Sequence, residues 1–168
     1  MKNRIGVYIL EVILVPTDRI KVIKDKETRE KIEKTLNVKL SFEENSVIIE
    51  SEGLELFRAK NVIKALGRGF SPEKAFRLFD EEENLEIIEL TEFKDNKMKV
   101  VKARLIGTEG KTRYMIESCS GCSVSVYGKT VSIIGKFDQM VIAREAINMI
   151  LRGSKHSKVY VFLQEAKL

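Results

Sequence analysis

The chain has 168 residues, of which 43% are hydrophobic and 33% charged, and its formal net charge is +5. This composition predicts a folded globular protein and excludes a disordered one, and no run of 18 apolar residues is present that could span a bilayer. With only two cysteines, and with Glu11 interrupting the apolar stretch from Ile5 to Val15, we expect a cytoplasmic protein without a signal peptide or membrane partner.

The sequence contains an internal repeat. Residues 28–69 align with residues 112–153 without a gap, at an offset of 84 positions, and 11 of the aligned positions are identical. Because the identities fall mostly at apolar and turn positions, the two halves are predicted to share one fold. We therefore expect two domains, residues 1–84 and residues 85–168.

In the first half, the apolar stretch from Ile5 predicts a long strand, and a helix is expected next. A hairpin, a long helix ended by glycines and a short helix with Ser71 as its N-cap and Pro72 at its first position should follow. The acidic run 80–83 predicts a solvated turn before one more strand. The expected elements are strand 5–15, helix 28–36, strands 38–42 and 47–50, helix 54–66 and strand 85–90.

The second half is expected to repeat this order. Partial alternation of apolar residues over 98–104 favours a strand, and an amphipathic stripe over 137–151, ended by Gly153, predicts a helix. By its position in the repeat, the segment 158–163 favours a further helix. The remaining expected elements are helix 112–118, stopped near Gly121, and a hairpin of strands around 124–126 and 130–134.

Only the second half keeps a glycine loop, Gly107-Thr108-Glu109-Gly110, whereas residues 22–27 of the first half contain no glycine. Two residues without a Cβ let the backbone turn sharply and approach a phosphate, and the following helix directs free N–H groups at the same place. Charge is also uneven, because residues 1–96 have a net charge of −3 and residues 97–168 one of +8. We expect a polyanion to be attracted to the second half, with Glu109 weakening the contact.

The segment from Leu105 to Ile116 resembles the core motif of a KH domain. The resemblance implies an α+β fold of two tandem type I KH domains (eukaryotic type, order βααββα), packed together with extra junction helices and strands. It also implies that the loop clamps about four unpaired nucleotides, and that the first domain is degenerate. The predicted RNA-binding residues are Lys102, Arg104, Ile106, Gly107, Thr108, Glu109, Gly110, Lys111, Thr112, Arg113, Ser123, Val124, Ser125 and Lys129.

Over nearly its full length the chain is similar to the Pno/Dim (Krr-like) small-subunit ribosome-assembly family of archaeal type. The residues that carry this resemblance are Arg68 to Ala75 (RGFSPEKA) and Arg152 to His156 (RGSKH). It implies a non-catalytic protein without cofactors that binds near the 3′ end of small-subunit rRNA, beside a Nob-type endonuclease. The alternative is a protein adaptor in which both KH folds dock proteins.

Cys119 and Cys122 form a C-x-x-C pair, which suits a redox centre, half of a zinc site or two structural thiols. No second pair exists and His156 is the only histidine, so structural cysteines are favoured and a metal site is not expected. A disulfide between the two cysteines stays open. Tyr114 and Tyr127 are candidates for base stacking, with packing in the core as the equal alternative, and His156 is expected on the surface.

Overall fold

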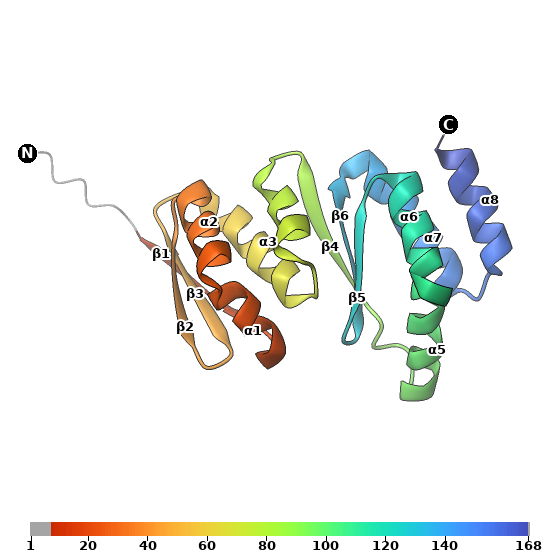
Figure 1. Cartoon of the computed structure of the whole chain (residues 1–168), viewed down its shortest axis with the longest axis horizontal. Helices are drawn as coiled ribbons and strands as arrows, with labels where there is room; N and C mark the ends of the chain where they lie inside the picture. Colours follow the sequence, from red (N-terminus) through yellow and green to blue (C-terminus); the bar gives the residue numbers. More distant parts are fainter. Residues whose placement is uncertain (1–7, 168) are drawn as a thin grey trace, which may run out of the picture. The chain divides into compact units, whose positions relative to one another are not determined.

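The computed structural model describes residues 8–167 and divides into two compact units, Met1–Phe79 and Asp80–Leu168. Each unit contains one three-stranded antiparallel sheet with helices on one face (Figure 1). The expected α+β class is therefore confirmed. Among residues 8–167, no helix is long and apolar enough to cross a membrane.

In the first unit, the sheet order is β1-β3-β2, and helices α1, α2 and α3 cover one face of it. Ile32 of α2, Ile49 of β3 and Ile63 of α3 belong to its core, and none of them has exposed surface. The Ser71 hydroxyl accepts a hydrogen bond from the Lys74 amide, which confirms the predicted N-cap. The elements are β1 Ile9–Leu14, α1 Thr17–Lys24, α2 Lys26–Leu36, β2 Lys39–Glu43, β3 Ser46–Ser51, α3 Glu55–Gly67, α4 Pro72–Ala75 and the 3₁₀ turn η1 Phe76–Phe79. Residues 5–7 of the predicted first strand lie outside the described residues.

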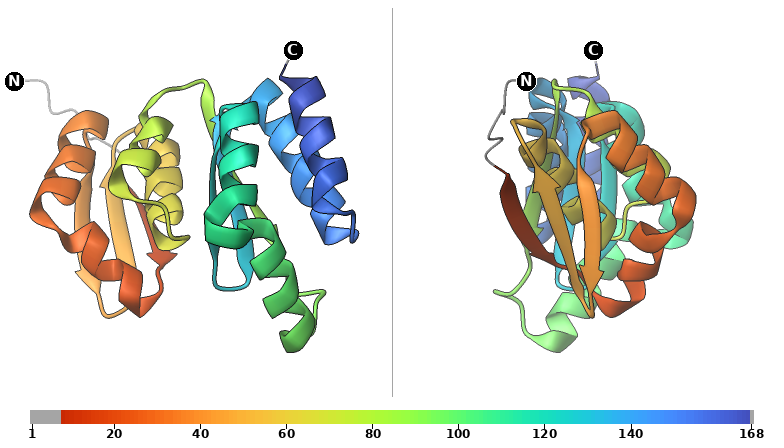
Figure 2. Two further views of the ribbon diagram at one scale, coloured as in Figure 1. Left: turned by 45° about the vertical axis from the view of Figure 1, so that its right-hand side comes forward. Right: turned by 90° about the vertical axis from the view of Figure 1, so that its left-hand side faces the viewer.

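In the second unit, the sheet order is β4-β6-β5 and the helices α5, α6 and α7 lie on one face, with α8 against α6 and α7 (Figure 2). The predicted hairpin, the predicted helix 137–151 and the predicted C-terminal helix are confirmed. The elements are β4 Glu83–Glu89, α5 Asp95–Ile106, the 3₁₀ turn η2 Thr108–Gly110, α6 Lys111–Ser120, β5 Ser123–Tyr127, β6 Thr130–Lys136, α7 Phe137–Leu151 and α8 His156–Ala166.

The predicted strand over residues 98–104 is wrong, because this segment belongs to helix α5. Its buried residues are Met98, Val101 and Leu105, a spacing of three and four that places them on one helical face. Val100, which the alternating pattern placed with Met98, is 59% exposed. The strand that opens this unit is β4, which pairs with β6 and was predicted over 85–90.

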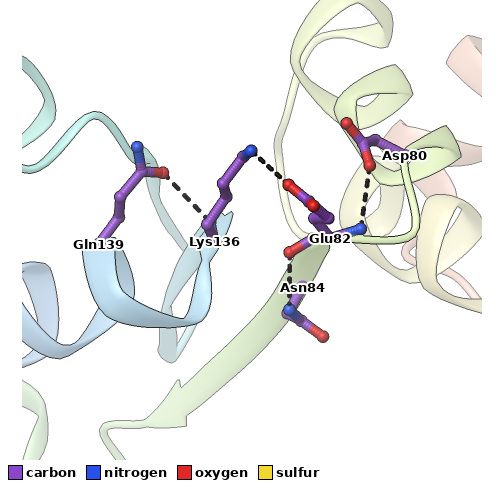
Figure 3. A network of polar contacts seen from close by, with 5 residues as sticks. All are labelled: Asp80, Glu82, Asn84, Lys136 and Gln139. Carbon is purple, nitrogen blue, oxygen red and sulfur yellow. Dashed lines mark hydrogen bonds and ion pairs between the residues drawn. The ribbon is translucent and has the colours of Figure 1, made fainter.

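The acidic run 80–83 belongs to the second unit, and this changes the charge balance. Residues 1–79 carry 16 basic and 12 acidic residues, a net charge of +4, and residues 80–168 carry 14 and 13, a net charge of +1. The expected contrast between an acidic and a basic half therefore does not follow the compact units. Part of the acidic charge is paired within its own unit, since Glu82 accepts a hydrogen bond from Lys136, which raises the pKa of that lysine (Figure 3).

Candidate nucleic-acid interface

Gly107 follows the last residue of α5 in a conformation that suits only glycine. Its φ and ψ angles are 75° and 172°, and its amide donates to the Ala103 carbonyl at 2.8 Å. A Cβ at this position would lie 2.3 Å from Oγ1 of Thr112 and 2.7 Å from the Thr112 amide nitrogen. Residue 107 therefore has to be glycine for α5 and α6 to approach each other this closely.

Gly110 completes the turn in the left-handed region, with φ 76° and ψ 12°, and nothing lies within 4 Å of a Cβ placed there. Helix α6 begins at the next residue without a side-chain hydrogen bond to cap it. The amides of its first turn lack intrahelical acceptors and carry the positive end of the helix dipole. This uncapped start, next to an open glycine, is suited to binding an anion.

The loop opens into a surface hollow of about 810 Å³. Five of the predicted RNA-binding residues line it together with Tyr114, which the sequence offered as a candidate for base stacking, and with Glu117, which the sequence interpretation of the site omitted. Tyr114 is 67% exposed, and an exposed aromatic ring can stack on a planar ligand. The full lining is Thr108, Glu109, Gly110, Lys111, Arg113, Tyr114 and Glu117.

Glu117 connects this hollow to the edge strand β5, because its Oε1 accepts a hydrogen bond from the Val124 amide at 2.8 Å. Val124 packs into the core of the unit, so the alternating residues Ser123 and Ser125 face the other side of the sheet, and both are buried. Base contact at this strand would therefore use its backbone edge and not the predicted serine side chains.

Arg104 and Thr112, both predicted RNA-binding residues, are engaged inside the protein. The Arg104 guanidinium donates to the carbonyl of Ile150 at 3.0 Å and also to the carbonyl of Ser154, at the end of α7. The Thr112 side chain has no exposed surface, and its hydroxyl shares a 2.8 Å hydrogen bond with that of Tyr160. Ile106 is half-buried just before the loop, while Lys102 on α5 and Lys129 in the hairpin turn lie outside the hollow.

The first unit contains the same arginine contact. Arg19 donates to the carbonyls of Leu66 at 2.8 Å and Phe70 at 2.7 Å, which are the positions 84 residues before Ile150 and Ser154. The two arginines, however, are 85 positions apart. The offset between the two units is therefore 85 residues at this arginine and 84 from residue 28 onward, so the 84-residue offset does not extend unchanged through the loop region.

The helix start and the strand edge that adjoin the hollow in the second unit are both occupied by side chains in the first unit. Asp25 caps α2 by accepting from the Thr28 amide at 3.2 Å, so a carboxylate occupies the helix start. The amide of Leu40, at the position equivalent to Val124, donates to Glu33 at 2.8 Å, just as the Val124 amide donates to Glu117. In the first unit the Leu40 carbonyl also accepts a hydrogen bond from Arg29 at 3.1 Å. Arg113, the counterpart of Arg29, instead lines the open hollow.

Neither cysteine forms a disulfide; Cys119 is half-buried near the end of α6, and Cys122 is buried with its thiol against Gly135. Among residues 8–167, no group of three or more His, Cys, Asp or Glu side chains is placed to hold a metal ion. His156, expected on the surface, is half-buried, and its Nε2 donates to the Arg104 carbonyl at 2.9 Å, so its ring is engaged within the protein.

Residues 84–168 match a family model described as a eukaryotic-type KH domain (KH-domain type I), the second such domain of PNO1. The chain is 38% identical over 168 residues to the KH domain-containing protein MJ0443 of Methanocaldococcus jannaschii, covering 94% of this chain and 74% of that protein. It is 34% identical over 128 residues to the pre-rRNA-processing protein PNO1 of Coccidioides immitis, covering 67% of this chain and 50% of that protein.

Two solved structures from Pyrococcus horikoshii are similar over nearly the whole chain. One is Dim2p in a complex with a/eIF2alpha and rRNA, with a TM-score of 0.89, 42% identity, and coverage of 96% of this chain and 95% of that chain. The other is Dim2p, with a TM-score of 0.86, 44% identity, and coverage of 94% and 99%. The expected resemblance to Pno/Dim proteins is confirmed.

Proposed function

Because the chain belongs to the PNO1-type family of KH-domain proteins, we propose that it is a non-catalytic RNA-binding protein of small ribosomal subunit biogenesis. Its second unit binds single-stranded rRNA near the 3′ end of the small-subunit rRNA. Two comparisons support this proposal: a PNO1 relative is a pre-rRNA-processing protein, and a Dim2p relative was solved in a complex with rRNA. The chain spans only about half the length of the PNO1 relative described above.

The observation that carries this proposal is the uncapped start of α6 beside Gly110, at the mouth of the hollow. The phosphate backbone lies against the loop, and Lys111 and Arg113 supply cations beside it. Bases enter the hollow, stack on Tyr114 and meet the backbone edge of β5 next to Glu117. Glu109 also lines the hollow, so its carboxylate opposes a phosphate and weakens binding.

In the same proposal, the chain is a tandem of type I KH domains, residues 1–84 and residues 85–168, of which the first is degenerate. Support comes from the first unit's element order, β1-α1-α2-β2-β3-α3, and from its closed helix start and strand edge. The first domain holds a ribosome-assembly protein, such as the Nob-type endonuclease that the family resemblance implies.

The adaptor alternative, in which both units dock proteins, is favoured by one feature of the first unit. Leu10, Val12 and Leu14 share one face of the edge strand β1 and are 63%, 60% and 79% exposed. A stripe of exposed aliphatic residues on a strand is typical of a protein contact. It concerns the first unit alone, and is therefore compatible with RNA binding by the second.

The test is fluorescence anisotropy with short single-stranded RNAs from the 3′ end of small-subunit rRNA. Gly110→Asp is the informative variant, because the site has room for a side chain and the new carboxylate would face the phosphate. Asp also tolerates the left-handed conformation better than most residues. We expect a loss of RNA affinity of about ten-fold or more, the effect of one charged contact made repulsive.

Gly53→Asp is the matched control, because residue 53 lies in the first unit and also has nothing within 4 Å of a Cβ. It adds the same charge and should leave RNA affinity unchanged, and circular dichroism should show both variants folded. Equal binding by folded Gly110→Asp and wild type would refute the loop as the phosphate site. If wild type binds none of the RNAs, the adaptor alternative is favoured.

A further inference from the structure

Helix α8 follows the six elements of the βααββα order and packs against α6 and α7 (Figures 1 and 2). Val159 and Leu163 anchor it, since neither side chain has exposed surface and both belong to the core of the second unit. The opposite side of the helix carries exposed residues such as Val161. Helix α8 is therefore an integral part of this unit, and its polar residues have fixed places relative to the glycine loop.

Two polar side chains of α8 bind the residues on either side of that loop. His156 donates to the carbonyl of Arg104, which is among the last four carbonyls of α5 and lacks a regular intrahelical donor. Four residues later, the Tyr160 hydroxyl is hydrogen-bonded to the Thr112 hydroxyl at 2.8 Å. The loop thus runs between two points that are both tied to one helix.

The Thr112 contact matters most for the loop, because this side chain touches Gly107. A Cβ placed on residue 107 would lie only 2.3 Å from Oγ1 of Thr112. A different rotamer of Thr112 would remove the hydroxyl from this position and relax the turn at Gly107. The Tyr160 hydroxyl holds the rotamer that is present, and does so in a buried site where an unpaired hydroxyl is unfavourable.

The Tyr160 ring makes a second contact with the loop region. Nζ of Lys111 lies 5.9 Å from the centre of the ring, within the range of a cation–π interaction. Lys111 is the first residue of α6 and lines the hollow. One side chain of α8 therefore orients both the turn and the cation nearest to it.

The first unit provides an internal comparison. The position 84 residues before Tyr160 is Phe76, which has no hydroxyl. Its threonine, Thr28, is buried like Thr112 but bonds to Asp25 Oδ2 at 3.3 Å, within its own helix start. At this position of the repeat, a tyrosine hydroxyl is thus present in the unit that has the glycine loop and absent from the other unit.

We propose that α8 is the positioning element of the phosphate-binding loop, and that Tyr160 acts on RNA affinity through Thr112. The proposal rests on the proposed RNA-binding function of the second unit. Tyr160 itself lies outside the lining of the hollow, so it is a positioning residue and not a ligand of the RNA.

The test compares Tyr160→Phe, which removes only the hydroxyl, with Tyr160→Leu, which also removes the ring beneath Lys111. We expect RNA affinity to fall about three- to ten-fold for Tyr160→Phe, the effect of one hydrogen bond, and further for Tyr160→Leu. Hydrogen exchange of the amides from residue 107 to residue 112 should become faster in both. Val161→Ala, on the exposed side of α8, is the control and should match wild type.

A double-mutant cycle distinguishes positioning from a general loss of stability. If Tyr160 acts through Thr112, Tyr160→Phe should have almost no further effect on RNA affinity in a Thr112→Val background. Equal, additive losses in both backgrounds would overturn the proposal, as would wild-type affinity and loop exchange in Tyr160→Phe. If wild type does not bind RNA, the proposed function fails, and loop exchange in Tyr160→Phe then decides the positioning role by itself.

Discussion

At the scale of single residues, the two loop glycines are needed for different reasons. Gly107 combines a backbone conformation available only to glycine with contact against Thr112. Gly110 is in the left-handed region, but space is open around it. Glu109 between them, with φ 54°, is a non-glycine residue in the left-handed region. The motif therefore has a closely packed glycine at its start and a glycine with open space around it at its end.

Alanine substitution should separate these roles. Gly107→Ala is expected to destabilise the protein by about 3 kcal/mol or more, since backbone strain and overpacking add. Gly110→Ala should cost about 1–2 kcal/mol, the strain of a left-handed residue alone. Chemical denaturation of both variants measures the difference. Equal destabilisation would show that Gly107 does not make the close approach to Thr112.

At the scale of elements, an arginine ties the first helix of each unit to the end of its long helix. Arg19 binds one carbonyl in the last turn of α3 and one in the segment after it, and Arg104 binds the two equivalent carbonyls in and after the last turn of α7. Carbonyls at a helix end lack intrahelical donors, and a guanidinium can satisfy two of them at once. The repeated contact explains why Arg104 is a structural residue, although its position beside the loop suggested RNA binding.

Arg104→Lys keeps the positive charge but removes the planar guanidinium that donates to two carbonyls at once. We expect it to destabilise the second unit by about 1–3 kcal/mol, because the carbonyls of Ile150 and Ser154 lose hydrogen bonds from a charged donor. Hydrogen exchange should show the loss in α5 and α7 and not in the first unit, and Arg19→Lys should show the reverse. If Arg104→Lys lowered RNA affinity while leaving exchange in α5 and α7 unchanged, Arg104 would be an RNA ligand after all.

At the scale of the whole molecule, net charge does not single out the second unit as the candidate for RNA binding, because the first and second units carry +4 and +1. The second unit contains the acidic strand β4, whose Glu86 is paired with Arg144 of α7, as Glu82 before it is with Lys136. The proposed function therefore assigns the attraction for RNA to the local arrangement of Lys111 and Arg113, which line the hollow at the loop. This predicts a shallow dependence of binding on salt.

The slope of log K against log salt changes by about 0.7 for each phosphate contact to a single strand. The double variant Lys111→Ala/Arg113→Ala should therefore reduce the slope by about 1.4. The control is Lys24→Ala/Lys26→Ala, which removes the same charge near the corresponding segment of the first unit and should leave the slope unchanged. If the two double variants had the same slope, binding would follow overall charge and not the loop.

Much of the fold could be predicted because it depends on local signals. Gly153 ends α7, Ser71 and Pro72 begin α4, and the turn 127–129 joins β5 to β6 as expected. The strand predicted over 98–104 failed because a short segment with mixed apolar and basic residues fits two periodicities. The burial of Met98 and Leu105 on one face, which decides between them, depends on the packing of other elements.

The sequence by itself determined the repeat, the asymmetry of the glycine loop and the family to which the chain belongs, because these depend on residue identity and spacing. Only the tertiary structure decided which polar residues line the hollow. Arg104 and Thr112 turn inward to satisfy carbonyls and a buried hydroxyl, while Tyr114 and Glu117 line the hollow. Hydrogen bonds between residues about 50 positions apart determine where these side chains point. Such bonds cannot be predicted from the spacing of neighbouring residues in the sequence.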